Sequence, residues 1–392
     1  MLELMTNTPR DYAWGSTTLL AELEGREPTG APEAEVWFGD HPGSPAVLVD
    51  GTSLPERLSA HGQPPLPYLL KLLAAGSPLS IQVHPSRTQA QAGWAREADL
   101  AMDAPERNYR DDNHKPELIV SLSERFEALC GLRPLEASRR YLAELGDAEG
   151  VRRLRSLIEP AAGASDADIL RAAIEELLAG DSARIVSDVT TALATTTSAE
   201  FVDELAAARR IAEVYPADPG IVVAMLMNLV ILRRGEAVYL RAGLLHAYLS
   251  GIGVEIMAAS DNVLRGGLTP KRVDVPELLT LLDAAPGVVP VIRPRALAGA
   301  TAVDTYGPGV ADFALAVARP DAVGGVVAEI RVDGPAIVLA TAGESTVELD
   351  GERVSLAPGQ AAIALGATGP LHIDGTGEVF IATPGEGIDS AS

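Results

Sequence analysis

The sequence predicts a mainly β protein of the sandwich or jelly-roll kind, interrupted by an inserted block of helices. Short apolar runs between Pro- and Gly-rich turns fill residues 1–133, and similar patterns fill residues 291–392. Between them, residues 134–232 place apolar side chains at helical spacing. The chain has 392 residues, too many for one compact core, so two or three domains are expected.

The strand pattern of the first part lies in three runs, AEVWFGDHPGSPAVLV, LSIQVHP and ELIVSLS. It returns after Glu236 in AVYLRAGLLHAYLSGIGVEIMAAS, and a short helix, PELLTLLDAA, is expected from Pro276. The C-terminal run PAIVLATAGESTVELDGERVSLAPGQAAIALG is broken by turns at Gly343, Asp350–Gly351 and Pro358–Gly359. Many short strands at regular spacing are typical of a sandwich or jelly roll.

Capping patterns predict helices in the middle of the chain. Ser165–Asp168 has the composition of a helix start, and Thr197–Glu200 reads as a capping box for a later helix. The longest apolar run, Ile221–Leu232, is too short to span a bilayer and contains Asn228. We therefore expect a buried core helix there.

Charge and cysteine content limit the partners and the location. The formal net charge is -23, which disfavours nucleic acid and anionic membranes as partners. Any site for an anionic substrate must then be a local basic patch. The single cysteine, Cys130, excludes an intramolecular disulfide framework and a thiolate metal cluster. The N-terminal segment MLELMTNTPRDYAWG lacks a basic start and an apolar run, so it is not expected to be a signal peptide, and a cytoplasmic location is expected. The chain is also expected to be a monomer.

Four residues form a candidate metal site. Gln82 and His84 in IQVHP are two residues apart, so a strand would direct both to one face. Glu117 stands in the same relation to Lys115 in DDNHKPEL, and His246 follows a Gly-containing turn in RAGLLHAY. Two imidazoles, a carboxylate and an amide oxygen suit Zn²⁺ and tolerate Mn²⁺, Co²⁺ or Fe²⁺, with a position left for water or substrate.

Spacing alone does not decide for this site. Each histidine could instead pack or face solvent by itself, and His41, His61 and His372 are assigned to that class. A metal site therefore needs support from other residues.

The lysines give that support. Only Lys71, Lys115 and Lys271 occur among 31 basic residues, so arginine serves for almost every ordinary cation. A retained lysine can supply a compact amine able to lose its proton, although codon bias is the alternative explanation. The segment SDNVLRGGLTPKR places Arg265, Lys271 and Arg272 around a Gly-Gly loop. Such a loop suits a phosphate or a developing enediolate, and it could also be a solvated turn.

Several common signatures are absent from the sequence. Gly251-Ile-Gly253 is not continued to a third glycine, and there is no phosphate-binding P-loop, G-x-S-x-G elbow or HExxH helix. These absences disfavour nicotinamide redox chemistry, ATP chemistry and hydrolysis by a catalytic triad.

Several blocks resemble one known family. The segments LPYLLKLLAAGSPLSIQVHP, DDNHKPEL and HAYLSGIGVEIMAASDNVLRGGLTPK are similar to the signature segments of type I mannose-6-phosphate isomerases. DYAWGS and AEVWFGDHPGSPA resemble that family's opening segments. The likeness runs from about Asp11 to Lys271 in the family's order, while the helical block and the C-terminal part agree in length and texture only.

The resemblance implies a cupin-type fold with jelly-roll barrels and an inserted all-α domain. Residues 1–133 with 233–290 would form the catalytic domain, 134–232 the helical insert, and 291–392 a cupin-like, metal-free β domain. The implied activity interconverts mannose 6-phosphate and fructose 6-phosphate through a cis-enediol, with one zinc ion per chain. A non-catalytic sugar-binding cupin and a cupin dioxygenase are the alternatives.

The resemblance also assigns roles. Gln82, His84, Glu117 and His246 match the family's metal ligands, and Arg265 matches its active-site arginine. From the chemistry of enediol formation, we expect Arg265 to face the oxyanion or the phosphate. Lys115, Glu255 and His114 are candidates for the proton relay, and Lys271 and Lys71 for holding the phosphate.

Overall fold

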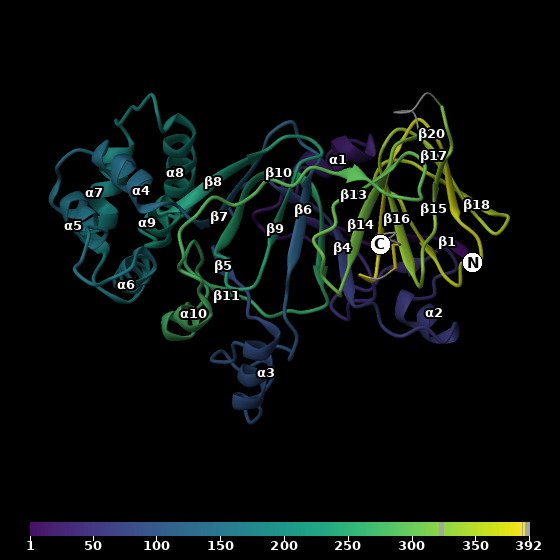
Figure 1. The fold of residues 1–392 in the computed structure, drawn as a ribbon, viewed down its shortest axis with the longest axis horizontal. Coiled ribbons are helices and arrows are strands. Elements are labelled where there is room, and N and C mark those ends of the chain that lie inside the picture. Colours follow the sequence, from purple (N-terminus) through teal and green to yellow (C-terminus); the bar gives the residue numbers. More distant parts are fainter. Residues whose placement is uncertain (321–324, 386, 389–392) are drawn as a thin grey trace.

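The computed structural model describes residues 1–320, 325–385 and 387–388. It consists mostly of antiparallel sheets, with helices gathered mainly at one end (Figure 1). Six helices in succession occupy that end, a nine-stranded sheet lies in the middle, and the C-terminal strands form the other end. None of the helices in the described residues combines the length and the apolarity needed to cross a membrane.

The middle sheet carries the residues singled out from the sequence. Its strands are β2 (Glu35–Phe38), β4 (Tyr68–Ala75), β5 (Gln82–Val83), β6 (Glu117–Ser121), β7 (Phe126–Leu132), β8 (Met227–Leu232), β9 (Ala237–Leu240), β10 (His246–Ala258) and β11 (Leu264–Arg265).

Strand β10 organises this sheet because it changes partners along its length. Its first half, from His246 to Ser250, pairs with β5 and β7, and its second half, from Gly251, pairs with β4 and β6. The ladder is irregular just before Gly251, which has a φ of 114°. A glycine there permits the bend, since an added Cβ would lie 2.8 Å from the Phe126 ring. Strand β10 thus connects the β5–β7 part of the sheet with the β4–β6 part.

Two further sheets form the C-terminal part. One has eight strands and includes β1 and β3 from the N-terminus: β12 (Arg295–Ala296), β13 (Val303–Thr305), β14 (Ala314–Ala318), β21 (Glu378–Thr383), β16 (Ala336–Ala342), β19 (Ala361–Ala364), β1 (Leu2–Thr6) and β3 (Val47–Leu48). The other has four: β15 (Ala328–Ile330), β20 (Leu371–Gly375), β17 (Ser345–Leu349) and β18 (Glu352–Leu356).

Both faces of the eight-stranded sheet are covered. Along β16, Ile337 and Leu339 join a core shared with the middle sheet, whereas Val338 and Ala340 join a core shared with the four-stranded sheet. The alternation of a strand accounts for this division. The expectation that residues 1–133 belong wholly with the first β unit needs correcting, because β1 pairs with β19 near the other end of the chain.

The helical end contains α4 (Leu135–Ala143), α5 (Glu149–Leu157), α6 (Asp166–Ala179), α7 (Ala183–Leu193), α8 (Val202–Val214) and α9 (Gly220–Met225). The remaining helices of the described residues are α1 (Leu19–Glu24), α2 (Leu54–Ala60), α3 (Arg87–Arg96) and α10 (Val275–Leu281). The predicted start of α6 is confirmed, since the Ser165 hydroxyl accepts from the Asp168 amide and the Asp168 carboxylate accepts from the Ser165 amide. The short helix expected from Pro276 is α10.

Two local predictions were wrong. The Thr197–Glu200 box does not start a helix, because the Ser198 hydroxyl accepts from the Glu200 and Phe201 amides and α8 begins at Val202. The run Ile221–Leu232 is not one helix, since α9 ends at Met225 and the following residues form β8, paired with β7. A short apolar run fits a buried helix or a buried strand equally well. The helical block therefore ends at Met225 rather than at residue 232.

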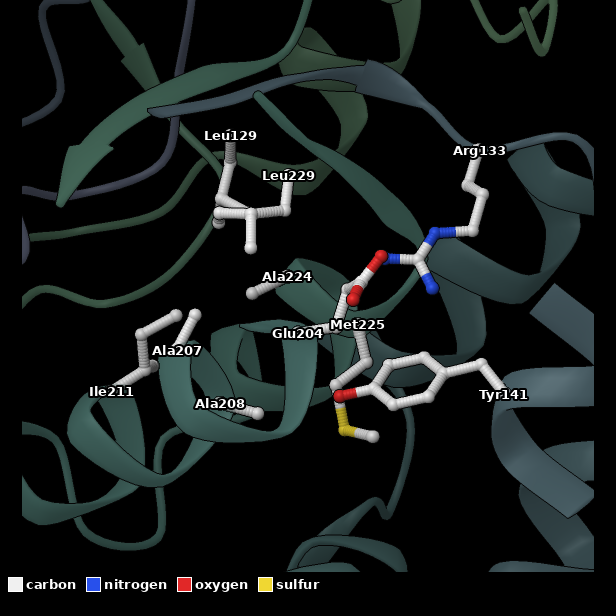
Figure 2. A pocket seen from close by; sticks show the side chains of 10 residues that line it. All are labelled: Leu129, Arg133, Tyr141, Glu204, Ala207, Ala208, Ile211, Ala224, Met225 and Leu229. Carbon is white, nitrogen blue, oxygen red and sulfur yellow. The ribbon is translucent and has the colours of Figure 1, made fainter. Parts of the chain in front are cut away.

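The junction between the helices and the middle sheet is built around Arg133. Its guanidinium lies over the Tyr141 ring, 4.8 Å from the centroid, and 3.9 Å from a carboxylate oxygen of Glu204 (Figure 2). One of its terminal nitrogens donates to the carbonyl of Met227 at 3.1 Å. Burial lowers the pKa of Arg133. These contacts fix the first helix of the block to the end of β7.

Candidate metal centre and active-site cavity

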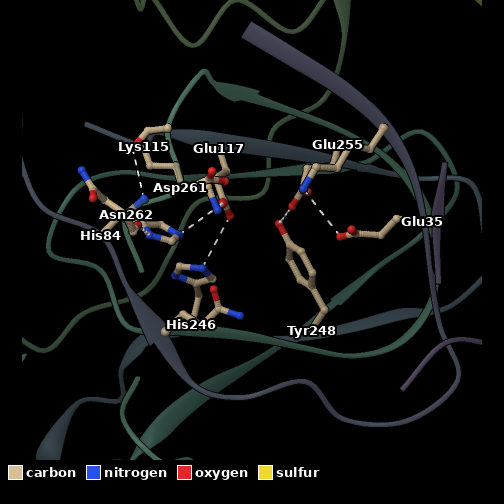
Figure 3. A network of polar contacts seen from close by, with 12 residues as sticks. Glu35, His84, Lys115, Glu117, His246, Tyr248, Glu255, Asp261 and Asn262 are labelled. Carbon is tan, nitrogen blue, oxygen red and sulfur yellow. Dashed lines mark hydrogen bonds and ion pairs between the residues drawn. The ribbon is translucent and has the colours of Figure 1, made fainter. Parts of the chain in front are cut away.

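Three buried side chains converge at the ends of three elements (Figure 3). His84 directly follows β5, Glu117 is the first residue of β6, and His246 is the first residue of β10. Nε2 of His84 lies 3.2 Å from one oxygen of Glu117, and Nε2 of His246 lies 3.5 Å from the other. Donor atoms of the three residues all lie within 4.8 Å of one another, which is the arrangement of a metal-binding cluster.

The hydrogen bonds of the imidazoles test whether the cluster fits a cation. Nδ1 of His84 lies 2.7 Å from the carbonyl of Asn262, and Nδ1 of His246 lies 3.0 Å from the carbonyl of Leu244. Since a carbonyl only accepts, each Nδ1 carries a proton, and in the neutral ring each Nε2 then offers a lone pair. Two lone pairs beside the Glu117 carboxylate repel one another, and a divalent cation relieves that repulsion. The residues therefore fit a metal ion.

The ionisation states agree with this fit. Burial alone would raise the pKa of Glu117, but Lys115, followed by His84, lowers it well below its usual range. The Lys115 amine lies 3.1 Å from the Glu117 carboxylate. Burial and then the neighbouring His84 lower the pKa of His246 to about 4. An ionised carboxylate and a neutral imidazole are the forms that bind a metal.

Gln82 lies next to His246 in the sheet. Its Cα pairs with that of His246 on one side and with that of Arg265 on the other. Its side chain lines the adjoining cavity and its amide nitrogen donates to the Ser80 hydroxyl at 3.4 Å. Its role as a fourth ligand remains a prediction.

A cavity of about 680 Å³ adjoins the centre. Its walls come from the N-terminal segment, β2, β4, the Arg265 loop and the end of α8, and they include Trp14, Trp37, Lys115, Arg265 and Tyr215. It is therefore assembled from distant parts of the chain, with aromatic and cationic side chains together. Such a polar cavity beside a metal centre suits a small polar ligand.

A second chamber, of about 360 Å³, lies beyond Arg265 and Lys271, which line both spaces. Arg110 also lines this chamber. Burial, followed by the charge of Arg110, lowers the pKa of Arg265, and the charge of Arg265, followed by burial, lowers that of Lys271. No ion pair to a carboxylate is found for these three cations within the described residues, whereas Arg272 pairs with Asp274 at 2.6 Å. Among the described residues, three cations of an acidic chain thus have no carboxylate partner and could pair with an anion.

Lys71 and Glu255 form a separate buried pair. They face each other across β4 and β10, with the amine 3.2 Å from a carboxylate oxygen, and Glu35 lies 3.6 Å from the same amine. Tyr248 donates to the other oxygen of Glu255 at 2.8 Å, and burial raises the pKa of Glu255. The charge of Lys71 is already compensated, so the structure does not favour it as a phosphate partner.

His114 lies elsewhere. Its Nε2 is 2.7 Å from the Asp312 carboxylate and 2.8 Å from a terminal nitrogen of Arg87. These contacts direct it to the loop before β14, and the structure does not bring it to the three-residue centre. His61 contacts the carbonyl of Arg57, and His372 is exposed near Glu329, so both remain outside the centre.

Sequence reasoning missed several residues of the cavity walls, among them the charged residues Glu35, Arg110 and Asp261. Asp261 lines both chambers, and Nε2 of His41 lies 3.1 Å from its carboxylate. That contact lowers the pKa of Asp261. Two sequence positions could have indicated these residues: Asp261 stands shortly before Arg265, and Arg110 directly precedes DDNHKPEL. Glu35 could not be found, because its pairing with Lys71 depends on sheet register.

The fold and the site together define a metalloenzyme: a buried His-Glu-His centre on antiparallel sheets, opening on a polar and partly cationic cavity. Comparisons with known proteins narrow this class. Residues 2–135 match the family model for the catalytic domain of type I phosphomannose isomerase. Mannose-6-phosphate isomerase of Salmonella typhimurium is 34% identical over 415 residues, covering 96% of this chain and 98% of the relative. The Escherichia coli enzyme is 33% identical with the same coverage.

Solved structures agree with these relatives. A variant of phosphomannose isomerase from Salmonella typhimurium superposes with a TM-score of 0.87 at 31% identity, covering 98% of this chain and 99% of the other. A zinc-bound mannose 6-phosphate isomerase superposes with a TM-score of 0.86 at 32% identity and the same coverage. The chain belongs to the type I phosphomannose isomerase family.

Proposed function

We propose that this chain interconverts mannose 6-phosphate and fructose 6-phosphate, as a metal-dependent aldose–ketose isomerase. The observation that carries the proposal is the buried His84–Glu117–His246 centre beside a cavity where Arg265 and Lys271 have no carboxylate partner among the described residues. A phosphosugar needs both features, one for its reacting oxygens and one for its phosphate. The printed names of the relatives support the same substrate pair. Family membership favours the isomerase over a sugar-binding cupin or a cupin dioxygenase.

We propose Zn²⁺ as the ion, held by His84, Glu117 and His246 with Gln82 as fourth ligand. Two imidazoles, a carboxylate and an amide oxygen suit zinc, and Mn²⁺, Co²⁺ or Fe²⁺ would be tolerated. A related structure is described as zinc-bound. When bound, the ion would polarise the sugar oxygens without any redox step.

The proton transfer between C1 and C2 is proposed to pass through a cis-enediol. Lys115 is a strong candidate for the relay, because its amine lies 3.1 Å from Glu117 and its side chain lines the cavity. Glu255 has a raised pKa, which suits a group that exchanges protons near neutral pH, but its oxygens are engaged by Lys71 and Tyr248. His114 is the less favoured candidate because of its contacts with Asp312. Arg265 would stabilise the charge that develops on the enediolate oxygen.

For the phosphate we propose Arg265 and Lys271, joined by Arg110. These cations line the second chamber together and repel one another, so an anion between them would lower their electrostatic energy. Lys71, considered from the sequence, already has two carboxylates at its amine. Arg110 therefore takes the place proposed for Lys71.

We further propose that the sheets form cupin jelly rolls: a catalytic one from residues 1–133 with 227–290 apart from β1 and β3, and a metal-free one in the C-terminal part that β1 and β3 join, with 134–226 as the helical insert. Of residues 291–392, positions 321–324, 386 and 389–392 lie outside the described residues. A cytoplasmic monomer remains the expectation, and light scattering after size-exclusion chromatography tests the oligomeric state.

The activity is tested by incubating the protein with mannose 6-phosphate and following fructose 6-phosphate, with and without a chelator. Formation that stops on chelation and returns with Zn²⁺ is the expected result. Rescue by Fe²⁺ but not by Zn²⁺, or no conversion by the zinc-loaded protein, would contradict the proposal.

A further inference from the structure

Asp218 links the helical block to the loop that follows Arg265. It lies between α8 and α9, and one oxygen of its carboxylate accepts from the Gly220 amide at 2.7 Å. That oxygen also accepts from the Leu268 amide at 3.0 Å, and the other oxygen accepts from the Thr269 amide at 3.1 Å. One carboxylate thus accepts hydrogen bonds from three backbone amides, two of them some fifty residues away.

The loop has a backbone that requires such support. Leu268 has a φ of 56°, a left-handed conformation that costs free energy in a residue with a Cβ. Its side chain is fully buried, so the conformation is held in place. Two consecutive amides, those of Leu268 and Thr269, point to the same carboxylate. Asp218 therefore stabilises an otherwise unfavourable turn.

The contact between the two segments is made backbone to backbone. A Cβ added at Gly267 would lie 2.6 Å from Cα of Gly220, and one added at Gly220 would lie 2.6 Å from the Leu268 amide nitrogen. Glycine at both positions permits this approach. On its other side, the loop exchanges hydrogen bonds with Ile81 through Gly266 and Gly267. The loop is thus clamped between the helical block and the segment that leads into Gln82.

The same loop carries the cations of the cavity. Arg265 precedes it in β11, and the Lys271 amide donates to the Thr269 hydroxyl at 3.1 Å. Leu268, Thr269 and Lys271 all line the cavity, together with Tyr215 from the helical block. A shift of Thr269 would therefore move Lys271 directly.

We propose that Asp218 is a positioning residue: it fixes the backbone at Leu268–Thr269 so that Arg265 and Lys271 face the substrate. This inference rests on the proposed function, because it takes these two cations to be substrate groups. The helical block would then contribute to substrate binding through the backbone of this loop, without a side chain of the block touching the sugar.

The test is Asp218→Asn, compared with Asp188→Asn. The asparagine amide group would face the Thr269 amide with a donor where an acceptor is needed, while the carbonyl could still serve Gly220 and Leu268. Asp188 is the matched control, since it also accepts from a distant amide, that of Gly150 at 2.8 Å, but within the helical block. We expect Asp218→Asn to raise KM for mannose 6-phosphate about tenfold, the effect of one lost hydrogen bond to a charged group. Zinc content should be unchanged, and Asp188→Asn should lower Tm without changing KM.

Hydrogen exchange gives a readout independent of turnover. The Leu268 and Thr269 amides should exchange faster in Asp218→Asn than in the wild type, and calorimetric titration with inorganic phosphate should show weaker binding. If the wild type does not convert mannose 6-phosphate, the proposed function fails while these two measurements still decide on Asp218.

A second variant covers the case in which Asp218→Asn does not fold. Gly220→Ala keeps the carboxylate but pushes the loop away through its Cβ, so KM should rise and the loop amides should exchange faster. The proposal would be overturned if either variant lowered Tm but left KM, phosphate binding and hydrogen exchange of the loop unchanged. Asp218 would then stabilise the fold alone.

Discussion

Nε2 of His84 lies 3.2 Å from the carboxylate of Glu117. Because Nδ1 donates its proton to a backbone carbonyl, Nε2 of the neutral ring carries a lone pair. Two groups that both donate electron pairs are held together in a buried place. Such a contact is unfavourable by itself and becomes favourable around a divalent cation. The stability of the fold should therefore depend on the metal.

Glu117→Gln should lose bound zinc and nearly all turnover, because the amide removes the charge that balances the cation. Zinc content by mass spectrometry and the isomerase assay measure both effects. Zinc should also raise the Tm of the wild type and leave that of Glu117→Gln unchanged, since an ion that binds only the folded state stabilises it.

Glu127→Gln is the control for the metal prediction. Glu127 is also a buried carboxylate, but it lies on β7 rather than β6, and it pairs with Arg125 at 2.7 Å. Its variant should keep zinc. A fully active, zinc-free Glu117→Gln protein would end the case for this centre.

Arg110→Gln should raise KM for mannose 6-phosphate about tenfold with a much smaller change in kcat, because the lost cation is proposed to contact the phosphate and not the reacting carbons. Inhibition by inorganic phosphate should weaken in parallel. Arg272→Gln is the matched comparison: it lines the same chamber, but its charge is compensated by Asp274. Equal effects of the two variants would mean that only the general field of the chamber matters.

Local spacing in the sequence predicted the strand positions of residues proposed for the centre. Gln82 and Glu117 lie in strands, His84 directly follows one, and each capping or turn pattern acts over a few residues. The resemblance to one family brought these segments together, which spacing could not do. The helix expected at Ile221–Leu232 failed for a related reason: the partner strand β7 lies far away in the sequence and decides between helix and strand.

What the sequence could not predict are relations between distant backbones. The pairing of Lys71 with Glu255 follows from the register of β4 on β10, and a shift of one residue would have turned them to opposite faces. The joining of β1 to β19 and the contact of Gly220 with Gly267 are likewise set by the packing of whole segments.

The pH dependence of substrate binding should report Lys271. Its pKa is lowered, first by Arg265 and then by burial, so it loses its proton at a lower pH than an ordinary lysine. KM for mannose 6-phosphate should therefore rise with pH on the alkaline side, beginning below the usual lysine range. In Lys271→Arg the guanidinium stays charged over that range, and this rise should disappear. A KM profile identical in both proteins would exclude Lys271 as the titrating group.

Lys71→Met should destabilise the fold strongly. The lysine amine is the buried counter-charge for Glu35 and Glu255, and although burial opposes its charge, these carboxylates raise its pKa. Removing it leaves two buried carboxylates without a cation, for which a loss of about 3–5 kcal/mol in unfolding free energy is expected. Urea unfolding of the zinc-loaded protein measures this loss. The double variant Lys71→Met/Glu255→Gln should recover part of it, because one uncompensated charge is removed while the new amide oxygen can still accept from Tyr248. If the two single losses simply add, the pair is not coupled, and Lys71 would again be free to serve the phosphate.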